Sequence, residues 1–296
     1  MKINKLFNLV LVLFGSFYLT SCHEMDLFPQ DQLGPDNFWK SERDIEMGLT
    51  GVYSKMKNGY MDWNMLWLEG MTDNAYCWQT KDKVYFNIQQ GYIESTTGGP
   101  VSGVYAGSYT GISACNVFLK NFYQVKESIF TSDSDANKYE AEVRFLRAYC
   151  YFNLVMHYGD VPLYKELLDT IEDYKVKQSP AEDVYAFINE DLDFAIENLE
   201  DVAYTSGHAV KASAKALKAR VALFRGDWKT VESETKGIID AGKNKLADTY
   251  ESIFIKREGQ ANNPEIIFSI NYMNPDYRHN AEMEFYYWTA LTPTQD

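Results

Sequence analysis

Apolar residues recur at helical spacing along most of the chain after residue 40. Ser41 and Asp44 have the spacing of a capping box, in which two side chains satisfy free backbone amides at the start of a helix. Four apolar residues then predict a first amphipathic helix that ends near Asn58: Ile45, Leu49, Val52 and Met56. Helical spacing returns from residue 104. Residues 134–158 carry apolar side chains on two faces, which predicts a long helix that is buried on both sides.

Start and stop residues delimit three more helices. Ser179 is the expected N-cap of one helix, with Pro180 in its first turn and Glu182 closing a capping box. An alanine-rich helix is expected over residues 211–225, where small side chains let a neighbouring helix approach closely, and a third helix is expected over 228–240. Glycines suited to helix C-terminal positions lie at the expected ends: Gly159, Gly226 and Gly242.

Residues 59–103 lack a helical stripe, so we expect a long aromatic loop insertion with one short strand. Loops of this length inside a compact domain are usually functional. Alternating residues over 265–272 predict a further short strand. The expected fold class is mainly α, an α–α superhelix of tetratricopeptide-like helix pairs without a regular tandem repeat. This helical domain is expected over residues 41–296, and its irregular tail predicts that it is truncated at the C-terminus.

The N-terminus has the pattern of an export signal. Two lysines precede a mostly apolar stretch over residues 6–19, which is shorter than the roughly 20 residues needed to span a bilayer. The stretch leads into Leu-Thr-Ser before Cys22, an order typical of the lipobox of bacterial lipoproteins. We therefore expect a lipoprotein signal peptide over residues 1–21, lipidation of Cys22, and an extended lipidated tether over 22–40.

The net charge argues against some classes of partner, and the cysteine content argues against a disulfide framework and a zinc site. The 296 residues include 28 Lys+Arg and 42 Asp+Glu, a formal net charge of −14. Basic residues do not cluster outside the extreme N-terminus, so no nucleic acid is expected as a partner. The mean hydropathy of −0.37 argues against a polytopic membrane protein. Three widely spaced cysteines besides Cys22 can form at most one disulfide and do not match a zinc site: Cys77, Cys115 and Cys150.

Sequence motifs for catalysis, cofactors and metals are missing. The chain has no GxSxG, HExxH, Walker or GxGxxG pattern, so no cofactor is expected. Residues 133–144 begin like a calcium loop, but Lys138 and Arg144 stand where glycine and glutamate are needed. No local motif marks the carboxylate pair of a glycoside hydrolase, although 42 acidic residues leave that alternative open.

Aromatic residues make up 15% of the chain and are frequent in the loop-rich segment. Flat Trp and Tyr rings match the C–H faces of pyranose sugars, while Asp, Asn and Gln supply hydrogen bonds that fix orientation. The alternative is that these rings form a small core beneath the loop. The candidate ligand-binding residues are four in this loop and two in the tail: Asp73, Asn74, Tyr76, Trp78, Tyr277 and Trp288.

Pieces spread over the whole chain keep the order and spacing seen in one known family. The most specific is the helix and corner over residues 140–163, and the lipobox is another. Further pieces follow in chain order: Asn37–Trp39, Gly51–Tyr53, Ser179–Tyr185, Ala214–Arg220, Gly226–Trp228, Pro264–Ile270 and Thr292–Gln295. Together they resemble the SusD/RagB family of nutrient-uptake outer-membrane lipoproteins.

The resemblance implies a mostly helical protein that is not an enzyme and is anchored through Cys22 on the extracellular face of the outer membrane. It also implies a SusC-like TonB-dependent transporter as partner, to which a captured glycan is delivered. In the starch-binding prototype an aromatic arc binds the glycan, and residues 73–78 correspond to part of it by neighbourhood. Three alternatives stay open: a peptide or other nutrient ligand, a scaffold subunit without ligand, and a surface glycoside hydrolase. Family members continue past the point where this chain stops, so it resembles the N-terminal part of a longer protein.

Overall fold

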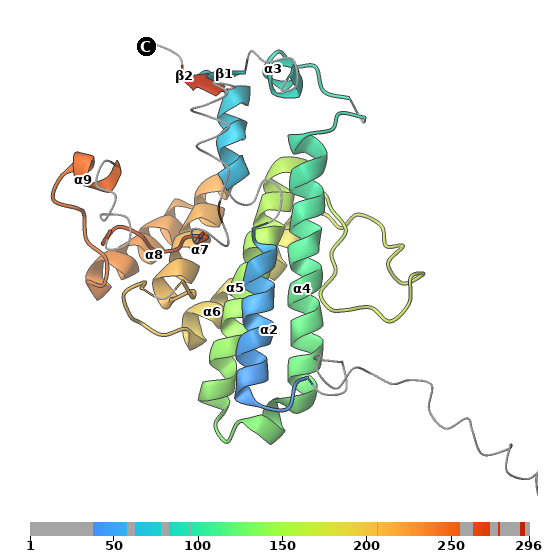
Figure 1. The fold of residues 1–296 in the computed structure, drawn as a ribbon, viewed down its shortest axis with the longest axis vertical. Coiled ribbons are helices and arrows are strands. Elements are labelled where there is room, and N and C mark those ends of the chain that lie inside the picture. The colour runs from blue at the N-terminus through green and yellow to red at the C-terminus, as the bar shows by residue number, and fades with distance from the viewer. Residues whose placement is uncertain are drawn as a thin grey trace, which may run out of the picture. The chain divides into compact units, whose positions relative to one another are not determined.

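The computed structural model describes residues 38–57, 63–77, 83–94, 96–205, 207–254, 263–272, 278 and 291–293. The chain divides into two units, Met1–Lys40 and Ser41–Asp296, and the described helices and strands all lie in the second. Helices make up most of its described part, which confirms the mainly α fold class (Figure 1). Among the described residues, no helix is both long enough and apolar enough to cross a bilayer.

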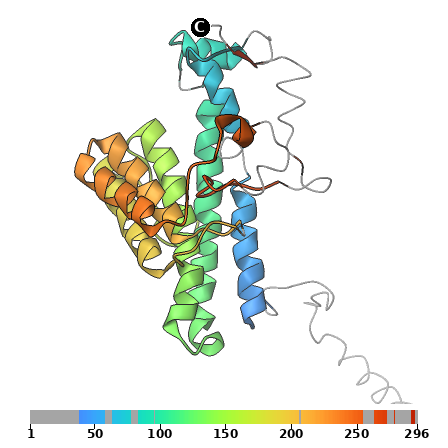
Figure 2. The same ribbon diagram turned by 90° about the vertical axis from the view of Figure 1, so that its left-hand side faces the viewer.

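Three helices lie side by side in this unit: α2 (Glu42–Lys55), α4 (Pro100–Ile129) and α5 (Asp133–Tyr158) (Figures 1 and 2). The predicted capping box at the start of α2 is confirmed. The Asp44 carboxylate accepts from the Ser41 backbone N–H at 2.9 Å, and the Ser41 hydroxyl accepts from the Asp44 N–H at 3.3 Å. Both contacts satisfy amides that the helix itself leaves without a partner.

Helix α4 starts at Pro100, earlier than the return of apolar spacing indicated, because proline suits the first helical turn, where its N–H is not needed. Further along, α4 approaches α5 and α2 closely at Gly111. A Cβ atom at this position would lie 2.6 Å from Cys150 Sγ and 2.8 Å from Met56 Cε. Glycine therefore allows the three helices to meet without a steric clash.

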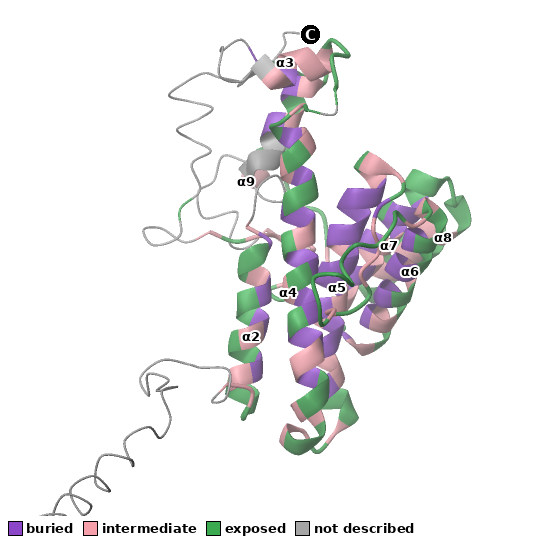
Figure 3. Cartoon of the chain, turned by 90° about the vertical axis from the view of Figure 1, so that its right-hand side faces the viewer, coloured by how far each residue is buried: buried purple, intermediate pink, exposed green. Residues whose placement is uncertain are grey.

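Helices α6 (Ala181–Asn198), α7 (Lys211–Arg225) and α8 (Trp228–Ala241) follow α5, and each packs against the one before it. The predicted ends of α7 and α8 are confirmed, since Gly226 and Gly242 adopt left-handed backbone with φ of 74° and 64°. Figure 3 shows that α5 is rich in buried positions, whereas α8 has no fully buried residue. A short helix, α9 (Tyr250–Phe254), comes next.

One predicted helix start is wrong. Helix α6 begins at Ala181, and the Ser179 side chain does not cap it. Ser179 is extended instead, and its backbone N–H donates to the Val161 carbonyl at 2.9 Å in an isolated β-bridge. The Asp160 carboxylate accepts from the Ala181 N–H at 2.8 Å. A contact from a distant residue therefore replaces the local cap that the sequence predicted.

The strand predicted over residues 265–272 is also wrong, because these described residues form no ladder. Their backbone carbonyls pair with side chains from the helical body. The Ser213 hydroxyl donates to the Ile267 carbonyl at 2.8 Å, and the Tyr204 hydroxyl donates to the Ser269 carbonyl at 3.0 Å. The alternating pattern therefore belongs to an extended segment that is held by side chains and not by another strand.

The segment expected to be a loop contains more regular structure than its sequence indicated. It holds a 3-10 helix, η2 (Trp63–Met71), a strand, β1 (Ala75–Cys77), and a helix, α3 (Lys83–Gln89). The expected short strand is present, and β1 pairs antiparallel with β2 (Leu291–Pro293). Sequence periodicity missed α3 because its seven residues are fewer than a helical pattern needs to be recognised.

Three cysteines of the described part are buried and reduced: Cys77, Cys115 and Cys150. Burial raises the pKa of the Cys115 thiol to about 12. The thiol therefore stays protonated at neutral pH. This agrees with the expectation that the cysteines do not form a disulfide framework.

A buried ion network joins α4, α5 and α6. Two guanidinium nitrogens of Arg147 donate to the two carboxylate oxygens of Asp191, both at 2.8 Å. The third guanidinium nitrogen of Arg147 donates to the Asn116 side-chain oxygen at 2.8 Å. Arg144 adds a second cation, which donates to Glu140 at 2.8 Å. Asp191 is 0% exposed, so its charge depends on these partners.

Asp191→Ala leaves the Arg147 charge buried and without its carboxylate. We expect the free energy of unfolding to fall by about 3–5 kcal/mol, measured by urea denaturation with circular dichroism. Lys236→Ala breaks an exposed pair with Asp240 and serves as the matched control, with an expected change below about 1 kcal/mol. Equal losses in the two variants would contradict a central role for the buried pair.

Candidate functional site

A polar turn precedes β1 and contains two of the predicted ligand residues. The Thr72 hydroxyl donates to the Glu69 carbonyl at 2.8 Å and accepts from the Asn74 backbone N–H at 3.1 Å. The Asn74 side-chain amide donates to the Glu69 carboxylate at 2.8 Å. Asp73 lies exposed in the same turn. Short side chains that bond to nearby backbone groups favour turns, so the sequence itself fixes this geometry.

Tyr76 points outward from β1. The side chains of Ala75 and Cys77 are buried, whereas Tyr76 is 45% exposed, as the alternation of a strand requires. Its ring meets the Phe86 ring of α3 edge to face, with centroids 5.5 Å apart and an interplanar angle of 82°. The Gln89 amide of the same helix donates to the Thr72 carbonyl, which ties α3 to the polar turn.

We call the group of exposed and half-buried residues around this ring the Tyr76 surface. It combines one aromatic face, held against Phe86, with amide and carboxylate groups from the neighbouring turn and helix. Its members come from η2, the polar turn, β1 and α3: Glu69, Asn74, Tyr76, Phe86 and Gln89. Such a mixture can stack against an apolar ring and hydrogen-bond to hydroxyl groups around it.

Other aromatic residues of the same segment form a small core beneath this surface. Trp67, Cys77 and Tyr85 are buried together, and Met71 and Val84 pack against them. The Trp67 and Tyr85 rings stack with centroids 5.2 Å apart and an interplanar angle of 22°. The alternative of a core beneath the loop therefore holds for these two rings, whereas Tyr76 remains available to a ligand.

The structure brings Asp73, Asn74 and Tyr76 together, as expected from their proximity in sequence. Four other predicted site residues lie outside the described residues: Cys22, Trp78, Tyr277 and Trp288. The pairing of β1 with β2 sets Tyr76 opposite Thr292, which brings residues 291–293 beside the candidate site. The sequence analysis did not select Glu69, Phe86 or Gln89, and only recognition of α3 as a helix would have indicated the last two.

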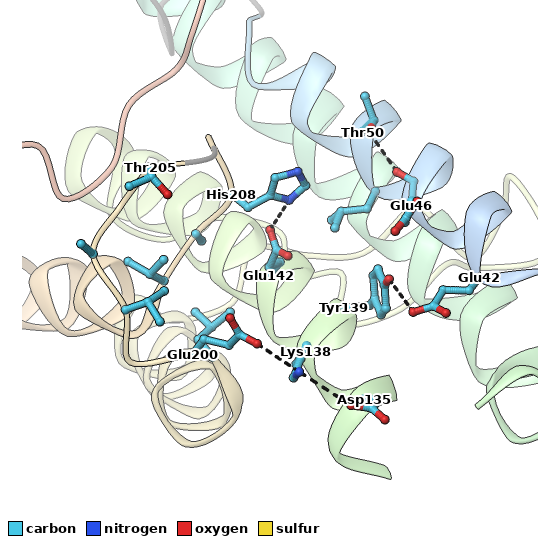
Figure 4. A pocket seen from close by; sticks show the side chains of 16 residues that line it. Glu42, Glu46, Thr50, Asp135, Lys138, Tyr139, Glu142, Glu200, Thr205 and His208 are labelled. Atoms are coloured by element: carbon cyan, nitrogen blue, oxygen red, sulfur yellow. Dashed lines mark hydrogen bonds and ion pairs between the residues drawn. The ribbon is translucent and has the colours of Figure 1, made fainter. Parts of the chain in front are cut away.

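An acidic cavity of about 580 Å³ lies between α2, α5 and the segment that follows α6 (Figure 4). Several of its carboxylates have partners within the cavity. The Tyr139 hydroxyl donates to Glu42 at 3.0 Å, and the Lys138 ammonium lies 3.1 Å from Glu200 and 3.7 Å from Asp135. Within the described ranges, no group of three or more His, Cys, Asp or Glu residues could hold a metal ion.

Glu142 connects the three segments around the acidic cavity. Its carboxylate accepts from the Tyr53 hydroxyl of α2 and lies 2.9 Å from His208 Nδ1 (Figure 4). The Tyr53 hydroxyl in turn accepts from the Ala209 N–H at 2.7 Å. Hydrogen bonding to Glu142 raises the pKa of His208, although partial burial opposes it. These contacts favour a structural role for Glu142 and His208.

The described part of the chain is a mainly α scaffold that carries an exposed aromatic surface. Residues 26–223 match the SusD-like family model described as "Starch-binding associating with outer membrane". The chain therefore belongs to the SusD-like family, which confirms the resemblance drawn from its sequence.

Individual relatives match over most of this chain but over about half of their own length. SusD-like protein P25 of Formosa agariphila is 26% identical, covering 90% of this chain and 52% of that protein. A SusD-like protein from Bacteroides fragilis has a solved structure with 26% identity and a TM-score of 0.71, covering 84% and 48%. A laminarin-binding SusD-like protein has 28% identity and a TM-score of 0.62, covering 72% and 48%.

The pair of His208 and Glu142 predicts a pH-dependent contribution to stability. Because the folded-state pKa of His208 is raised above 6.5, the pair stabilises most below this pH, and the effect is lost as pH rises through the folded pKa. His208→Gln should therefore cost up to about 1 kcal/mol at low pH and less at high pH, since the ring is half exposed. Urea denaturation of the wild type and the variant, at pH values below and above the folded-state pKa of His208, measures this loss of stability. If the stability loss caused by His208→Gln depends on pH in the same way when residue 142 is glutamine, the assignment is contradicted.

Proposed function

We propose that this chain captures an extracellular glycan at the Tyr76 surface and delivers it to a SusC-like TonB-dependent transporter in the outer membrane. One observation carries the proposal. Tyr76 is 45% exposed and held against Phe86, in a chain that belongs to the SusD-like family. A ring that is already held in place loses little conformational freedom when a ligand stacks on it.

Binding at this surface is non-covalent. A pyranose ring stacks with its C–H face on Tyr76, and its hydroxyl groups bond to the polar groups around the ring. Asn74 and Gln89 offer amide groups for this purpose, and Glu69 offers carboxylate oxygens. Capture needs no bond to be made or broken, so the proposal assigns no catalytic residue and treats the chain as a binding protein.

A neutral glucan is the ligand class that these observations favour. The formal net charge of −14 disfavours an anionic polysaccharide. The family model carries a starch-binding description, and a laminarin-binding relative shares 28% identity with this chain. Laminarin and its oligosaccharides are therefore the first probes to test.

Three aromatic residues outside the described part belong to the proposal as well. Trp78 directly follows β1 in sequence, and Trp288 lies three residues before Leu291, the first residue of β2. Both are therefore close in sequence to the paired strands that include Tyr76. Tyr277 belongs to the same C-terminal stretch. We propose that these rings extend the stacking surface, together with Asp73 at its polar edge.

We propose that a lipid at Cys22 anchors the protein on the outer face of the outer membrane. The sequence before Cys22 resembles a lipobox, and residues 22–40 would act as the tether between the lipid and the helical domain over 41–296. The family model describes proteins that associate with the outer membrane, which supports this location. A chain that is anchored beside a transporter could pass its bound glycan directly to that transporter.

Tyr76→Ala removes the aromatic face and should weaken binding of laminarihexaose by about 1–3 kcal/mol, which is the range for a binding hot spot. Isothermal titration calorimetry of the full chain in detergent measures this. Trp78→Ala should have a similar effect. Trp228→Ala removes an exposed ring on α8 and is the matched control, for which no change in affinity is expected.

Two results would contradict this placement of the ligand. One is an unchanged affinity in Tyr76→Ala. The other is a lowered melting temperature in proportion to the loss of binding, which would assign the Tyr76 ring to the structural core. A chain that binds no member of a panel of neutral glucans, xylans, mannans and peptides would favour a scaffold role without ligand.

Cys22→Ser should abolish lipidation. We expect the wild-type chain to incorporate labelled palmitate and to fractionate with outer membranes, and the variant to do neither. Ser21→Ala alters the neighbouring position but keeps the thiol, so it is the control and should retain the anchor. Membrane association of the Cys22→Ser variant that equals the wild type would contradict anchoring through this residue.

A further inference from the structure

A cavity lined by aromatic side chains lies between α4 and the loop that connects α5 with α6. This loop lies beside α4 in Figure 1. The cavity has a volume of about 260 Å³. Four tyrosines line it, together with Ser113 and Asn116: Tyr105, Tyr109, Tyr164 and Tyr174. We call it the tyrosine groove, and none of its lining residues belongs to the Tyr76 surface.

The four rings of the tyrosine groove form a continuous series of contacts. The centroids of Tyr105 and Tyr109 are 4.8 Å apart, those of Tyr109 and Tyr164 are 5.7 Å apart, and those of Tyr164 and Tyr174 are 5.4 Å apart. Tyr105 is 37% exposed and Tyr174 is 38% exposed. The two ends of the series therefore reach solvent, while Tyr109 and Tyr164 connect them.

Hydrogen bonds hold the groove open in one conformation. The Tyr109 hydroxyl donates to the Pro162 carbonyl at 2.7 Å, and the Tyr164 hydroxyl donates to the Tyr174 carbonyl at 2.9 Å. The Asn116 amide of α4 donates to the Tyr164 carbonyl at 3.0 Å. Several ring hydroxyls are thus committed to the loop backbone. What the tyrosines offer a ligand is the flat part of the ring, already in position.

The groove carries no formal charge. Its lining contains tyrosine, serine, asparagine and aliphatic side chains, with no acidic or basic residue among them. Burial, with a smaller contribution from Tyr105, raises the pKa of Tyr109, so this hydroxyl stays protonated at physiological pH. A charged ligand would lose hydration here without gaining an ion pair, whereas a neutral ligand with apolar faces would not.

We propose that the tyrosine groove is a second glycan-binding site, which holds a single sugar unit of a neutral polysaccharide. The size supports one unit, because pockets for drug-sized ligands begin at about 300 Å³. Aromatic faces suit the C–H face of a pyranose, and the exposed Ser113 hydroxyl supplies a polar contact at the rim.

This inference rests on the proposed function, since it assumes that the chain meets a glycan at the Tyr76 surface. A second site on the same chain would retain a long polysaccharide after it leaves the first. Two weak contacts with one polymer give an apparent affinity that exceeds either alone. The groove should therefore matter more for a polysaccharide than for a short oligosaccharide.

Native affinity electrophoresis of the full chain in detergent, in gels that contain laminarin, starch, xylan or mannan, tests the proposal. For the polysaccharide that retards the wild-type chain, Tyr105→Ala should raise the dissociation constant about fivefold or more. Tyr105→Phe keeps the ring and should bind like the wild type. Trp228→Ala is the control for loss of an exposed ring elsewhere, and circular dichroism verifies that each variant is folded.

The outcomes separate the groove from the proposed function. Retardation that depends on Tyr76 but is unchanged by Tyr105→Ala overturns the second site and leaves the proposed function in place. Retardation lost equally in Tyr105→Ala and Tyr105→Phe overturns stacking as its basis. No retardation of the wild-type chain by any of the four polysaccharides contradicts the groove and the proposed function together.

Discussion

The ion pair between Arg147 and Asp191 is the constraint on which the arrangement of the helices depends. The pair joins α5 to α6, and other Arg147 contacts reach Asn116 of α4 and the carbonyl of Lys165 in the loop before α6, each at 2.8 Å. Because a charge at this depth is costly without its partner, the three helices and the loop are held in one relative position. Asn116 connects this network to the tyrosine groove, since its side-chain amide donates to the Tyr164 carbonyl.

Aromatic side chains serve two purposes in this structure. Trp67 and Tyr85 stack inside the small core beneath β1, whereas Tyr76 lies on the outer side of the same strand. In the loop before α6, Tyr164 contributes its hydroxyl to the backbone and its ring to the groove. The rings that face solvent are held by neighbouring rings, Tyr76 by Phe86 and Tyr174 by Tyr164, so a sugar that stacks on them would cost little conformational freedom.

Local signals explain which parts of the fold could be predicted. The capping box at Ser41 and the glycines at 226 and 242 act within a few residues, and the sequence alone located those helix ends. The errors come from contacts between distant residues. Asp160 caps α6 in place of Ser179, and Tyr204 and Ser213 occupy the carbonyls of a segment whose alternation resembled a strand. The same holds for the candidate site. The composition of the loop indicated Asp73, Asn74 and Tyr76. Phe86 and Gln89 come close to them only because α3 packs against the polar turn and β1.

Glycan capture at the Tyr76 surface is the central claim, and hydrogen–deuterium exchange of the full chain with and without laminarin tests it most directly. Ligand stacked on Tyr76 would slow amide exchange in the polar turn and in α3, over residues 72–77 and 83–89. We expect protection at those two segments to grow with laminarin concentration. Unchanged exchange at saturating laminarin, or protection confined to the segment beside the acidic cavity, would contradict it.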